Sequence, residues 1–275
     1  GCLSQWDRGG ECRKAFPEVD GWTGVNDLPD IVRCIEGKTS CCGSGLPTYL
    51  YDENTPRLQL TVPHMAYLKI ADGCDNCCTY CAIPGIRGSL RSRSVSSVVK
   101  EAENLISGGV KELLVIAQDI TAFGADRPES GETLVTLLEA LDRLEGNFVI
   151  RLLYTHPAHY TDEFIDYLAR ENTRVLPYID MPLQHISDRI LQDMHRHVSK
   201  ARILDILQSL RSKVKDLTLR TTFITGFPGE TEEEFNELLD FIREQKFERC
   251  GVFPFSAEPR TAAAKMKDQI PPEIA

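Results

Sequence analysis

The chain has 275 residues, of which 42% are hydrophobic and 26% are charged, proportions that are ordinary for a soluble globular protein. It contains no apolar run long enough to cross a bilayer and no secretory signal at its start, so we expect no membrane partner and a cytoplasmic location. Its net charge of −10 would repel a phosphate backbone and attract a basic protein, which argues against direct nucleic-acid binding by this chain.

Residues 1–60 are rich in Gly, Pro, Asn and Asp, which are typical of turns and loops. We expect one short helix at 28–35 and little stable core in this stretch. Because the chain starts without Met, we also expect it to be a piece of a longer protein.

From residue 62 onward, apolar runs alternate with helical patterns. Runs typical of strands occur at 65–71, 112–118, 148–154, 175–180, 217–225 and 247–255. Helices with an apolar period of 3.6 residues are expected after Ser94, Ser199 and Thr231, and Thr231 and Glu234 have the form of a capping box. Strands that alternate with helices predict a parallel sheet with right-handed crossovers.

These six strand–helix units are fewer than the eight of a complete barrel, so we expect an α/β fold with an open, partial (β/α)6 barrel. Active sites of barrel folds gather at the carboxyl ends of the strands. The stretch CDNCCTYCAIPGIRG begins at Cys74, directly after the first strand, and is therefore expected at this rim.

Four cysteines of this stretch are too crowded for ordinary disulfides with one another, which favours metal or cluster binding: Cys74, Cys77, Cys78 and Cys81. Structural zinc is usually held by two separated pairs of ligands, and no second pair follows downstream. The spacing Cys74-x3-Cys78-x2-Cys81 would hold a four-iron cluster at three corners and leave the fourth iron open. On spacing alone, a zinc knot and buried free thiols are alternatives.

This spacing after the first strand, with Tyr80 before the last cysteine, resembles the radical S-adenosylmethionine (radical SAM) superfamily. The resemblance implies that Cys74, Cys78 and Cys81 hold a [4Fe–4S] cluster and that Cys77 is not a ligand. In this superfamily the open iron binds S-adenosylmethionine, and an electron from the cluster cleaves it to a 5′-deoxyadenosyl radical.

Further blocks resemble the methylthiotransferases of this superfamily, most closely the RimO type, which modifies an aspartate of a small-subunit ribosomal protein. They lie at 73–93, 117–124, 151–163, 178–191 and 219–235, and the likeness extends over roughly 62–270. The block AQDIT at 117–121 is similar to the ribosomal-protein branch rather than the tRNA branch.

The family pattern implies three regions. Residues 1–60 would be the C-terminal remnant of an N-terminal α/β domain plus linker, 61–262 the radical SAM core, and 263–275 the start of a linker to a TRAM domain. Three cysteines of the N-terminal domain hold an auxiliary [4Fe–4S] cluster, and GCLSQ puts Cys2 at the last of them. The full-length enzyme would hold two [4Fe–4S] clusters, of which one has its complete site here.

The resemblance also implies contacts to S-adenosylmethionine from two glycines and from an aromatic residue in the cysteine loop, residues 74–81. Polar residues in or after strands are further candidates, because strand ends can face the mouth of the barrel. These are Tyr80, Gln118, Asp180, Arg220, Gly226 and Gly229. Each has an ordinary alternative, because polar groups at a rim can bond one another and a tight strand–helix turn needs glycine anyway. No catalytic residue of the chain itself is assigned.

Five other cysteines match no ligand position of the family and are interpreted as incidental thiols: Cys12, Cys34, Cys41, Cys42 and Cys250. Three histidines at strand ends or in loops lack a metal-ligand spacing that we trust, and structural roles are expected for them: His156, His159 and His185.

The implied function is addition of a methylthio group to the β-carbon of an aspartate. The expected partners are the small-subunit ribosomal protein or ribosome and an external electron donor such as flavodoxin or ferredoxin. A tRNA adenosine methylthiotransferase, with the same fold and clusters, is the nearest alternative, and the acidic charge and AQDIT block argue against it. A zinc-binding adaptor with a basic partner is the distant alternative, and metal and sulfide analysis would separate it.

Overall fold

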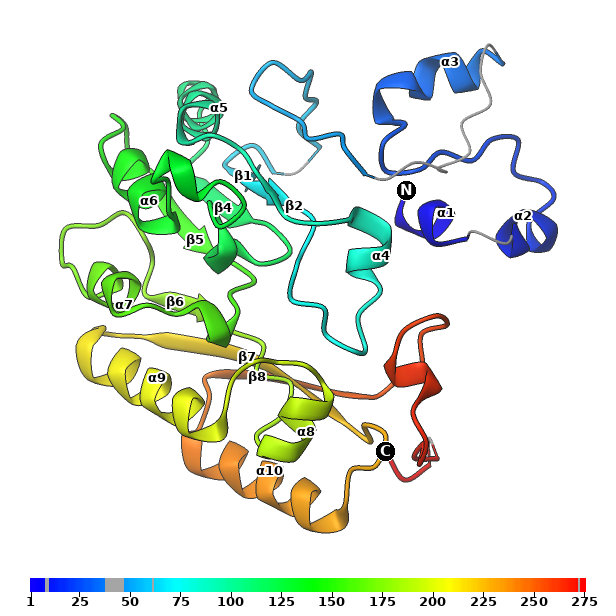
Figure 1. The fold of residues 1–275 in the computed structure, drawn as a ribbon. Coiled ribbons are helices and arrows are strands. Elements are labelled where there is room, and N and C mark those ends of the chain that lie inside the picture. Colours follow the sequence, from blue (N-terminus) through cyan, green and yellow to red (C-terminus); the bar gives the residue numbers. More distant parts are fainter. Residues whose placement is uncertain (8–9, 38–46, 61, 272) are drawn as a thin grey trace.

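Six parallel strands frame the part of the chain that the structure, a computed structural model, describes: residues 1–7, 10–37, 47–60, 62–271 and 273–275 (Figure 1). They are β1 (Met65–Lys69), β4 (Glu112–Ile116), β5 (Val149–Leu152), β6 (Tyr178–Asp180), β7 (Thr218–Thr225) and β8 (Arg249–Pro254). They pair in the orders β1-β4-β5 and β6-β7-β8, and a parallel bridge from Ile150 to Val175 connects the two groups. The strands follow one another in chain order, which confirms the expected partial barrel.

Helices lie outside this sheet (Figure 1). They are α5 (Val95–Ser107), α6 (Leu134–Asp142), α7 (Asp162–Leu168), α8 (Asp188–Asp193), α9 (Lys200–Lys213) and α10 (Glu232–Gln245). The expected helix starts are confirmed, because the side chains of Ser94, Ser199 and Thr231 each accept a hydrogen bond from a backbone N–H of the first turn. Glu234 completes the capping box of α10 by accepting from the N–H of Thr231 (3.0 Å).

The two faces of the sheet differ in exposure. On β1, Ala66 and Leu68 are fully buried in the core, whereas Tyr67 between them is 44% exposed on the opposite, concave face. β7 alternates in the same way, with Phe223 buried against α10 and Arg220 partly exposed on the concave face. Parallel sheets usually bury both faces, so a partly open concave face is the expected place for bound ligands.

A two-stranded clasp frames the cysteine loop. β2 (Ala71–Asp72) pairs antiparallel with β3 (Arg91–Ser92), and α4 (Ile83–Arg87) lies between them in the chain. The single strand expected at 65–71 is therefore wrong at its end, because the chain leaves the parallel sheet after β1 to pair with β3. Gly73 has a φ of +81° in this turn, and a side chain there would overlap the carbonyl of Ser89.

The segment before residue 60 contributes little core, as expected. Val25 is the one buried hydrophobic side chain among its described residues. The helix expected at 28–35 is confirmed as η1 (Leu28–Asp30) followed by α3 (Ile31–Ile35), while α1 (Cys2–Trp6) and α2 (Glu11–Ala15) were not predicted. α1 contacts α4, which brings the start of the chain beside the cysteine loop (Figure 1).

Short 3-10 helices complete the described elements: η2 (Ile120–Ala122), η3 (Pro128–Ser130), η4 (Pro157–His159) and η5 (Ala263–Lys265). Among the helices of the described residues, none has both the length and the apolarity that a membrane span requires.

Candidate active site

The cysteine loop follows the carboxyl end of β1, as predicted, and backbone bonds hold both of its ends. The N–H of Cys74 donates to the carbonyl of Gly88 (3.1 Å), and the N–H of Cys81 donates to the carbonyl of Cys78 (3.0 Å). The thiols therefore sit on an ordered frame rather than on a loose loop.

Thr79 ties the middle of this loop to two other parts of the molecule. Its N–H and hydroxyl donate to the carbonyls of Met194 (3.1 Å) and Asp193 (2.8 Å) at the end of α8. Its own carbonyl accepts from the N–H of Ala263 (2.8 Å) in η5. Segments far apart in the sequence thus meet at the cysteine loop.

Cys77 differs from the other three thiols of the loop. It is exposed and has a left-handed φ of +52°, whereas Cys74, Cys78 and Cys81 are partly buried. Burial raises the pKa of Cys74 to about 11 and raises the pKa of Cys81. A coordinated metal deprotonates such thiols outright, so metal binding at this loop would release protons.

Arg196 packs against the loop from the segment after α8. Its side chain is buried, and Nη1 lies 3.6 Å from Sγ of Cys78 and 3.3 Å from the hydroxyl of Tyr80. Nη2 donates to the carbonyl of Pro182 (2.6 Å). The sequence analysis missed Arg196, since a single arginine between two histidines matches no motif and its burial depends on the tertiary fold.

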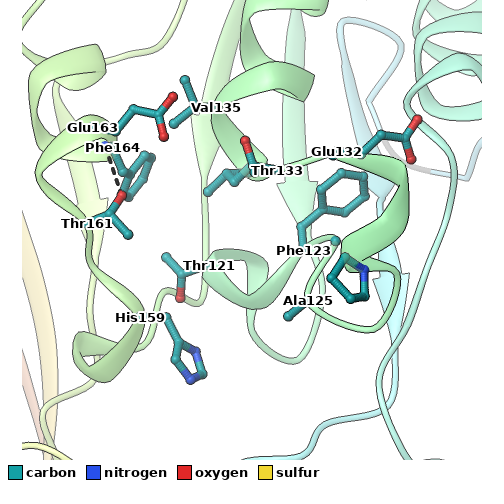
Figure 2. A pocket seen from close by; sticks show the side chains of 14 residues that line it. Thr121, Phe123, Ala125, Glu132, Thr133, Val135, His159, Thr161, Glu163 and Phe164 are labelled. Carbon is teal, nitrogen blue, oxygen red and sulfur yellow. Dashed lines mark hydrogen bonds between the residues drawn. The ribbon is translucent and has the colours of Figure 1, made fainter.

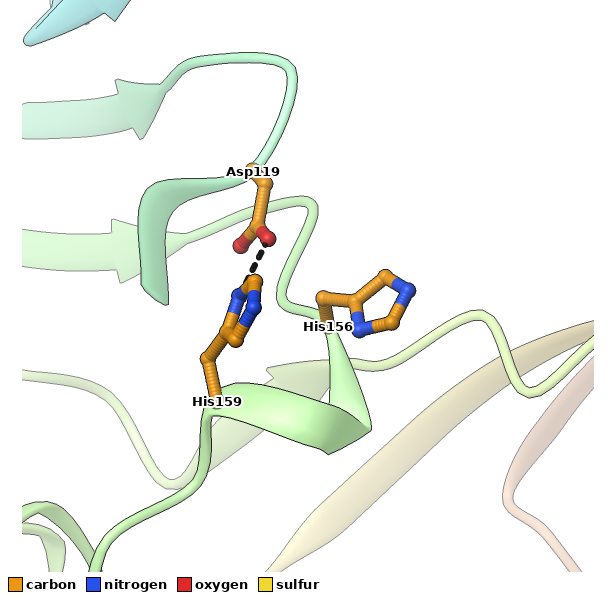
Figure 3. Close-up of side chains that lie close together, drawn as sticks. All are labelled: Asp119, His156 and His159. Carbon is orange, nitrogen blue, oxygen red and sulfur yellow. Dashed lines mark hydrogen bonds and ion pairs between the residues drawn. The ribbon is translucent and has the colours of Figure 1, made fainter. Parts of the chain in front are cut away.

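Asp119, shortly after the end of β4 at Ile116, is the centre of a hydrogen-bonded unit beside the loop (Figure 3). One carboxylate oxygen accepts from the N–H (2.9 Å) and hydroxyl of Thr121, and the other from Nδ2 of Asn76 (2.8 Å) and Nδ1 of His159 (2.8 Å). Burial alone would raise the pKa of Asp119, but these bonds and the nearby imidazoles lower it on balance. The carboxylate is thus ionised and anchors the loop through Asn76.

His156 completes this group. Potential ligand atoms of Asp119, His156 and His159 lie within 4.8 Å of one another, a proximity that the sequence spacing did not reveal. Each oxygen of Asp119 already accepts protein hydrogen bonds, so we interpret the trio as a structural network, in line with the expected roles of the histidines. Burial and the charge of Arg196 lower the pKa of His156 to about 3. Its ring is therefore neutral near pH 7, with Nε2 buried and without a partner among the described residues.

His185 has the structural role expected for it. The ring is fully buried, Nδ1 accepts from the N–H of Ser187 (3.0 Å), and Nε2 lies 2.9 Å from a carboxylate oxygen of Glu230. The other oxygen of Glu230 accepts from the N–H of Gly226. This relay fixes the turn between β7 and α10.

Two pockets adjoin the Asp119 unit. One, of about 390 Å³, is lined by Cys74, Asn76 and Asp119 and opens on the cysteine loop. The other, of about 380 Å³, lies between η2 and the start of α7, with His159 and Thr121 at its edge toward the first (Figure 2). The first pocket is the better candidate for cofactor binding, because a predicted cluster ligand lines it.

Gln118 lies between β4 and Asp119, and its side-chain oxygen is buried without a partner in the described part of the chain. Gln184 shares this property; it has a left-handed φ of +73° and bridges to Phe223 in β7. Buried polar atoms are nearly always paired in proteins, so these two acceptors suit donor groups of a bound ligand. The sequence analysis did not single out Gln184, because no sequence pattern predicts a left-handed φ at a glutamine.

Tyr80 and the predicted glycine turn lie close together. Tyr80 packs with Ile224 against a small core that contains Phe227, next to Gly226. The turn needs its glycines, since Gly226 and Gly229 have φ of +68° and +78°, and a side chain on Gly226 would overlap Ala275.

Asp180 and Arg220 form a pair between β6 and β7. Arg220 lies in the first half of β7, five residues before Thr225, which corresponds to roughly 17 Å along the strand. Its Nη1 donates to Oδ1 of the fully buried Asp180 (2.6 Å). Asp180 is the last residue of β6, and its carbonyl accepts from the N–H of Thr155 (2.9 Å), so the pair lies at the carboxyl end of β6.

Cys2 lies on the loop side of the structure. Its Sγ accepts from Nη2 of Arg87 in α4 (3.2 Å), which follows the cysteine loop. Among the cysteines interpreted as incidental, Cys12 and Cys250 are free thiols, and Cys41 and Cys42 lie outside the described residues. The interpretation of Cys34 as a thiol is wrong, because its sulfur is in a disulfide bond.

Comparison with known proteins now decides the family. The profile described as the radical SAM superfamily matches residues 68–242, more than half of the chain. The chain belongs to the radical SAM superfamily. The matched region begins in β1, includes the cysteine loop and ends in α10, so it covers the partial barrel up to α10 and leaves out β8.

Curated relatives of the chain belong to a narrower group within this superfamily. The chain is 46% identical to the ribosomal protein uS12 methylthiotransferase RimO of Pelotomaculum thermopropionicum, over 100% of this chain and 62% of the relative. It is 48% identical to the RimO of Akkermansia muciniphila, over 98% of this chain and 64% of the relative. The chain thus spans somewhat under two thirds of the length of these relatives.

Solved structures agree with the fold. The cobalamin-dependent S-adenosylmethionine radical enzyme OxsB matches with a TM-score of 0.64 at 14% identity, over 96% of this chain and 41% of OxsB. The radical S-adenosylmethionine methyltransferase TsrM of Kitasatospora setae matches with a TM-score of 0.59 at 18% identity, over 72% of this chain and 38% of TsrM. At these identities the likeness concerns the fold alone.

Proposed function

We propose that the protein to which this chain belongs is a radical SAM methylthiotransferase that adds a methylthio group to the β-carbon of an aspartate in ribosomal protein uS12. The observation that carries the proposal is the identity of 46–48% to two RimO proteins over 98–100% of the chain. The cysteine loop at the carboxyl end of β1 supports it, because the chemistry needs three thiolates at that position.

The residues present fit a [4Fe–4S] cluster with one open iron, with S-adenosylmethionine as its partner. Cys74, Cys78 and Cys81 are partly buried on one ordered loop, Cys77 is exposed, and thiolates are the usual ligands of such clusters. When bound, the pair would supply a carbon radical able to take hydrogen from an unactivated carbon, which acid–base groups cannot do at neutral pH.

The chain itself would position the cofactor and exclude water. We assign Tyr80 and the turn containing Gly226 and Gly229 to its apolar and backbone contacts, since they adjoin one small core. Gln118 offers a buried, unpartnered acceptor for a donor group such as an amine or hydroxyl. The loop-side position of these residues supports their assignment to the cofactor.

Three arginines, in β5, β7 and β8, are candidates for the partner of the substrate carboxylate, while Asp180 and Arg220 stay predictions as contacts of the cofactor. On the concave face, Arg151 is paired with Glu112 (2.5 Å) and Arg220 with Asp180 (2.6 Å), so each pair is neutral overall. Arg249 is the register partner of Arg220 in β8, is exposed, and has no ion-pair partner among the described residues. We therefore propose Arg249 as the cation that meets the carboxylate of the substrate aspartate.

The remaining assignments rest on the relatives. We propose that 1–60 is the end of an auxiliary-cluster domain with Cys2 as one ligand, 61–262 the core, and 263–275 the start of a linker to a TRAM domain. The greater length of the relatives supports these further parts. A reductant such as flavodoxin or ferredoxin would serve as electron donor, and a ribosomal substrate places the enzyme in the cytoplasm.

Incubation of the full-length enzyme with uS12 and tRNA, followed by mass spectrometry of both, tests the proposal. We expect one methylthio group on an aspartate of uS12 and no change in the tRNA. A methylthio group on a tRNA adenosine, with the protein unmodified, would move the enzyme to the tRNA branch.

A further inference from the structure

Arg196 is a buried cation without a carboxylate partner in the described residues. It is 4% exposed, and its side-chain hydrogen bonds go to a thiol, a phenol and a backbone carbonyl. Nε is also buried and has no partner in this part of the chain. A buried charge is costly unless an opposite charge compensates it. We therefore expect that an anionic group lies beside Arg196 in the working enzyme.

Asp119, an acidic residue whose charge acts on Arg196, does not fill this role. Asp119 influences Arg196 electrostatically, yet its carboxylate bonds Thr121, Asn76 and His159 instead. His156, which also faces Arg196, is neutral near pH 7 and brings no negative charge. Among the three groups that Arg196 contacts, the sulfur of Cys78 is the one that becomes anionic when it binds a metal.

We propose that Arg196 is the counter-ion of the cluster held by Cys74, Cys78 and Cys81, and that it sets the reduction potential of that cluster. The inference rests on the proposed function, because it requires a cluster at this loop. Three thiolates make the assembly anionic, and reduction adds one further negative charge. A fixed cation in a poorly solvated site stabilises the reduced form more than the oxidised form, so it raises the potential.

The fold holds this guanidinium rigidly. The N–H of Arg196 donates to the carbonyl of Leu191 (2.9 Å), which continues the end of α8. Its neighbours His195 and His197 have left-handed φ of +54° and +52°, so the chain turns sharply on both sides of it. The bond of Nη2 to Pro182 fixes the side chain, and the bond of Thr79 to Met194 fixes the loop on the same segment. Arg196 is thus a positioning and charge-supplying residue, and it is not assigned a catalytic step.

The test is a redox titration of the full-length enzyme, reconstituted anaerobically and reduced with dithionite in the absence of S-adenosylmethionine. Arg196→Gln is compared with wild type, with Arg196→Lys, and with Arg243→Gln as control. Arg243 is an exposed arginine of α10, and its ion pair is with Asp240 of the same helix. Iron content and circular dichroism are measured for each variant.

We expect Arg196→Gln to shift the midpoint potential to a more negative value, Arg196→Lys to restore most of the shift, and Arg243→Gln to match wild type. An unchanged potential in iron-loaded Arg196→Gln would overturn the inference. If the potential is unchanged and the variant binds S-adenosylmethionine more weakly, the inference is also wrong. The anion that pairs with Arg196 would then be the carboxylate of that cofactor and not the cluster.

Two further outcomes are decisive. If Arg196→Gln misfolds or binds no iron, the lysine variant decides: iron binding with a near-wild-type potential supports a charge role, and failure to bind iron contradicts it. A wild-type protein that carries no iron–sulfur cluster would instead refute the proposed function itself.

Discussion

Asp180 and Arg220 are neighbours in register on β6 and β7, and Nη1 of Arg220 donates to Oδ1 of Asp180 over 2.6 Å. Asp180 is fully buried, whereas the side chain of Arg220 is 43% exposed. Arg220 therefore compensates the charge of a carboxylate that has little access to water.

Arg220→Gln should lower the free energy of unfolding by about 2 kcal/mol, because it leaves Asp180 buried without its cation. The exposed pair of Arg243 and Asp240 provides the matched control, since Arg243→Gln should cost less than about 0.5 kcal/mol. Urea unfolding of each variant measures the difference. Equal losses in the two variants would show that the Asp180–Arg220 pair contributes no more than a surface pair.

Arg249→Gln should remove selectivity for an anionic substrate. Wild-type full-length enzyme is expected to prefer an aspartate peptide of uS12 to its asparagine counterpart. The variant should lose about tenfold in kcat/KM on the aspartate peptide, equivalent to about 1.4 kcal/mol, and change little on the asparagine peptide. Cleavage of S-adenosylmethionine without peptide should stay as in wild type. A preference for aspartate that survives the substitution would reject Arg249 as the carboxylate partner.

Cys77 and Cys78 provide a matched pair of adjacent cysteines. Cys78→Ala should abolish iron binding at the core site, as should Cys74→Ala and Cys81→Ala, because three thiolates are needed to hold the cluster. Cys77→Ala should keep both iron and reductive cleavage of S-adenosylmethionine, since its thiol is exposed. Iron content after anaerobic reconstitution measures this. A Cys77→Ala protein without iron would make the ligand assignment wrong.

His156 should make stability depend on pH below neutrality. Its pKa is about 3 in the folded state against an ordinary value of 6.5, so the unfolded chain binds a proton in this window and the folded chain does not. The contribution of the neutral His156 ring to the free energy of unfolding is therefore fully present above about pH 6.5. It is lost progressively as the pH falls toward 3. Between pH 6.5 and 5 the loss should be about 1–2 kcal/mol.

The control for this prediction is His156→Gln, which cannot take up the proton. Thermal unfolding between pH 5 and 6.5, above the range in which ordinary carboxylates titrate, isolates the effect. The variant should show a flatter profile than wild type. Parallel profiles of the two proteins would show that His156 is protonated equally in both states.

Most of the barrel was predictable because its strands are apolar runs separated by helical periods. All six parallel strands lie within the predicted runs. The clasp of β2 and β3 was not predictable, because strands of two residues are too short to show alternation and their partners lie about twenty residues apart. The starts of the capped helices were predictable, because Ser94, Ser199 and Thr231 each bond a backbone N–H only three residues later in the chain.

The candidate site was predictable only in part. The cysteine spacing is contiguous in sequence and therefore visible, and Cys77 could be separated from the ligands by resemblance. The contact of Arg196 with Cys78 spans 118 residues, and no local pattern reveals it. The pairing of Asp180 with Arg220 likewise depends on the register of β6 and β7, which the sequence does not specify.

Metal and sulfide analysis of this 275-residue chain, reconstituted anaerobically, tests the central claim most directly. We predict about four irons and four sulfides per chain at the loop of Cys74, Cys78 and Cys81, with conversion of S-adenosylmethionine to 5′-deoxyadenosine on reduction. One equivalent of zinc without sulfide, and no 5′-deoxyadenosine, would contradict it.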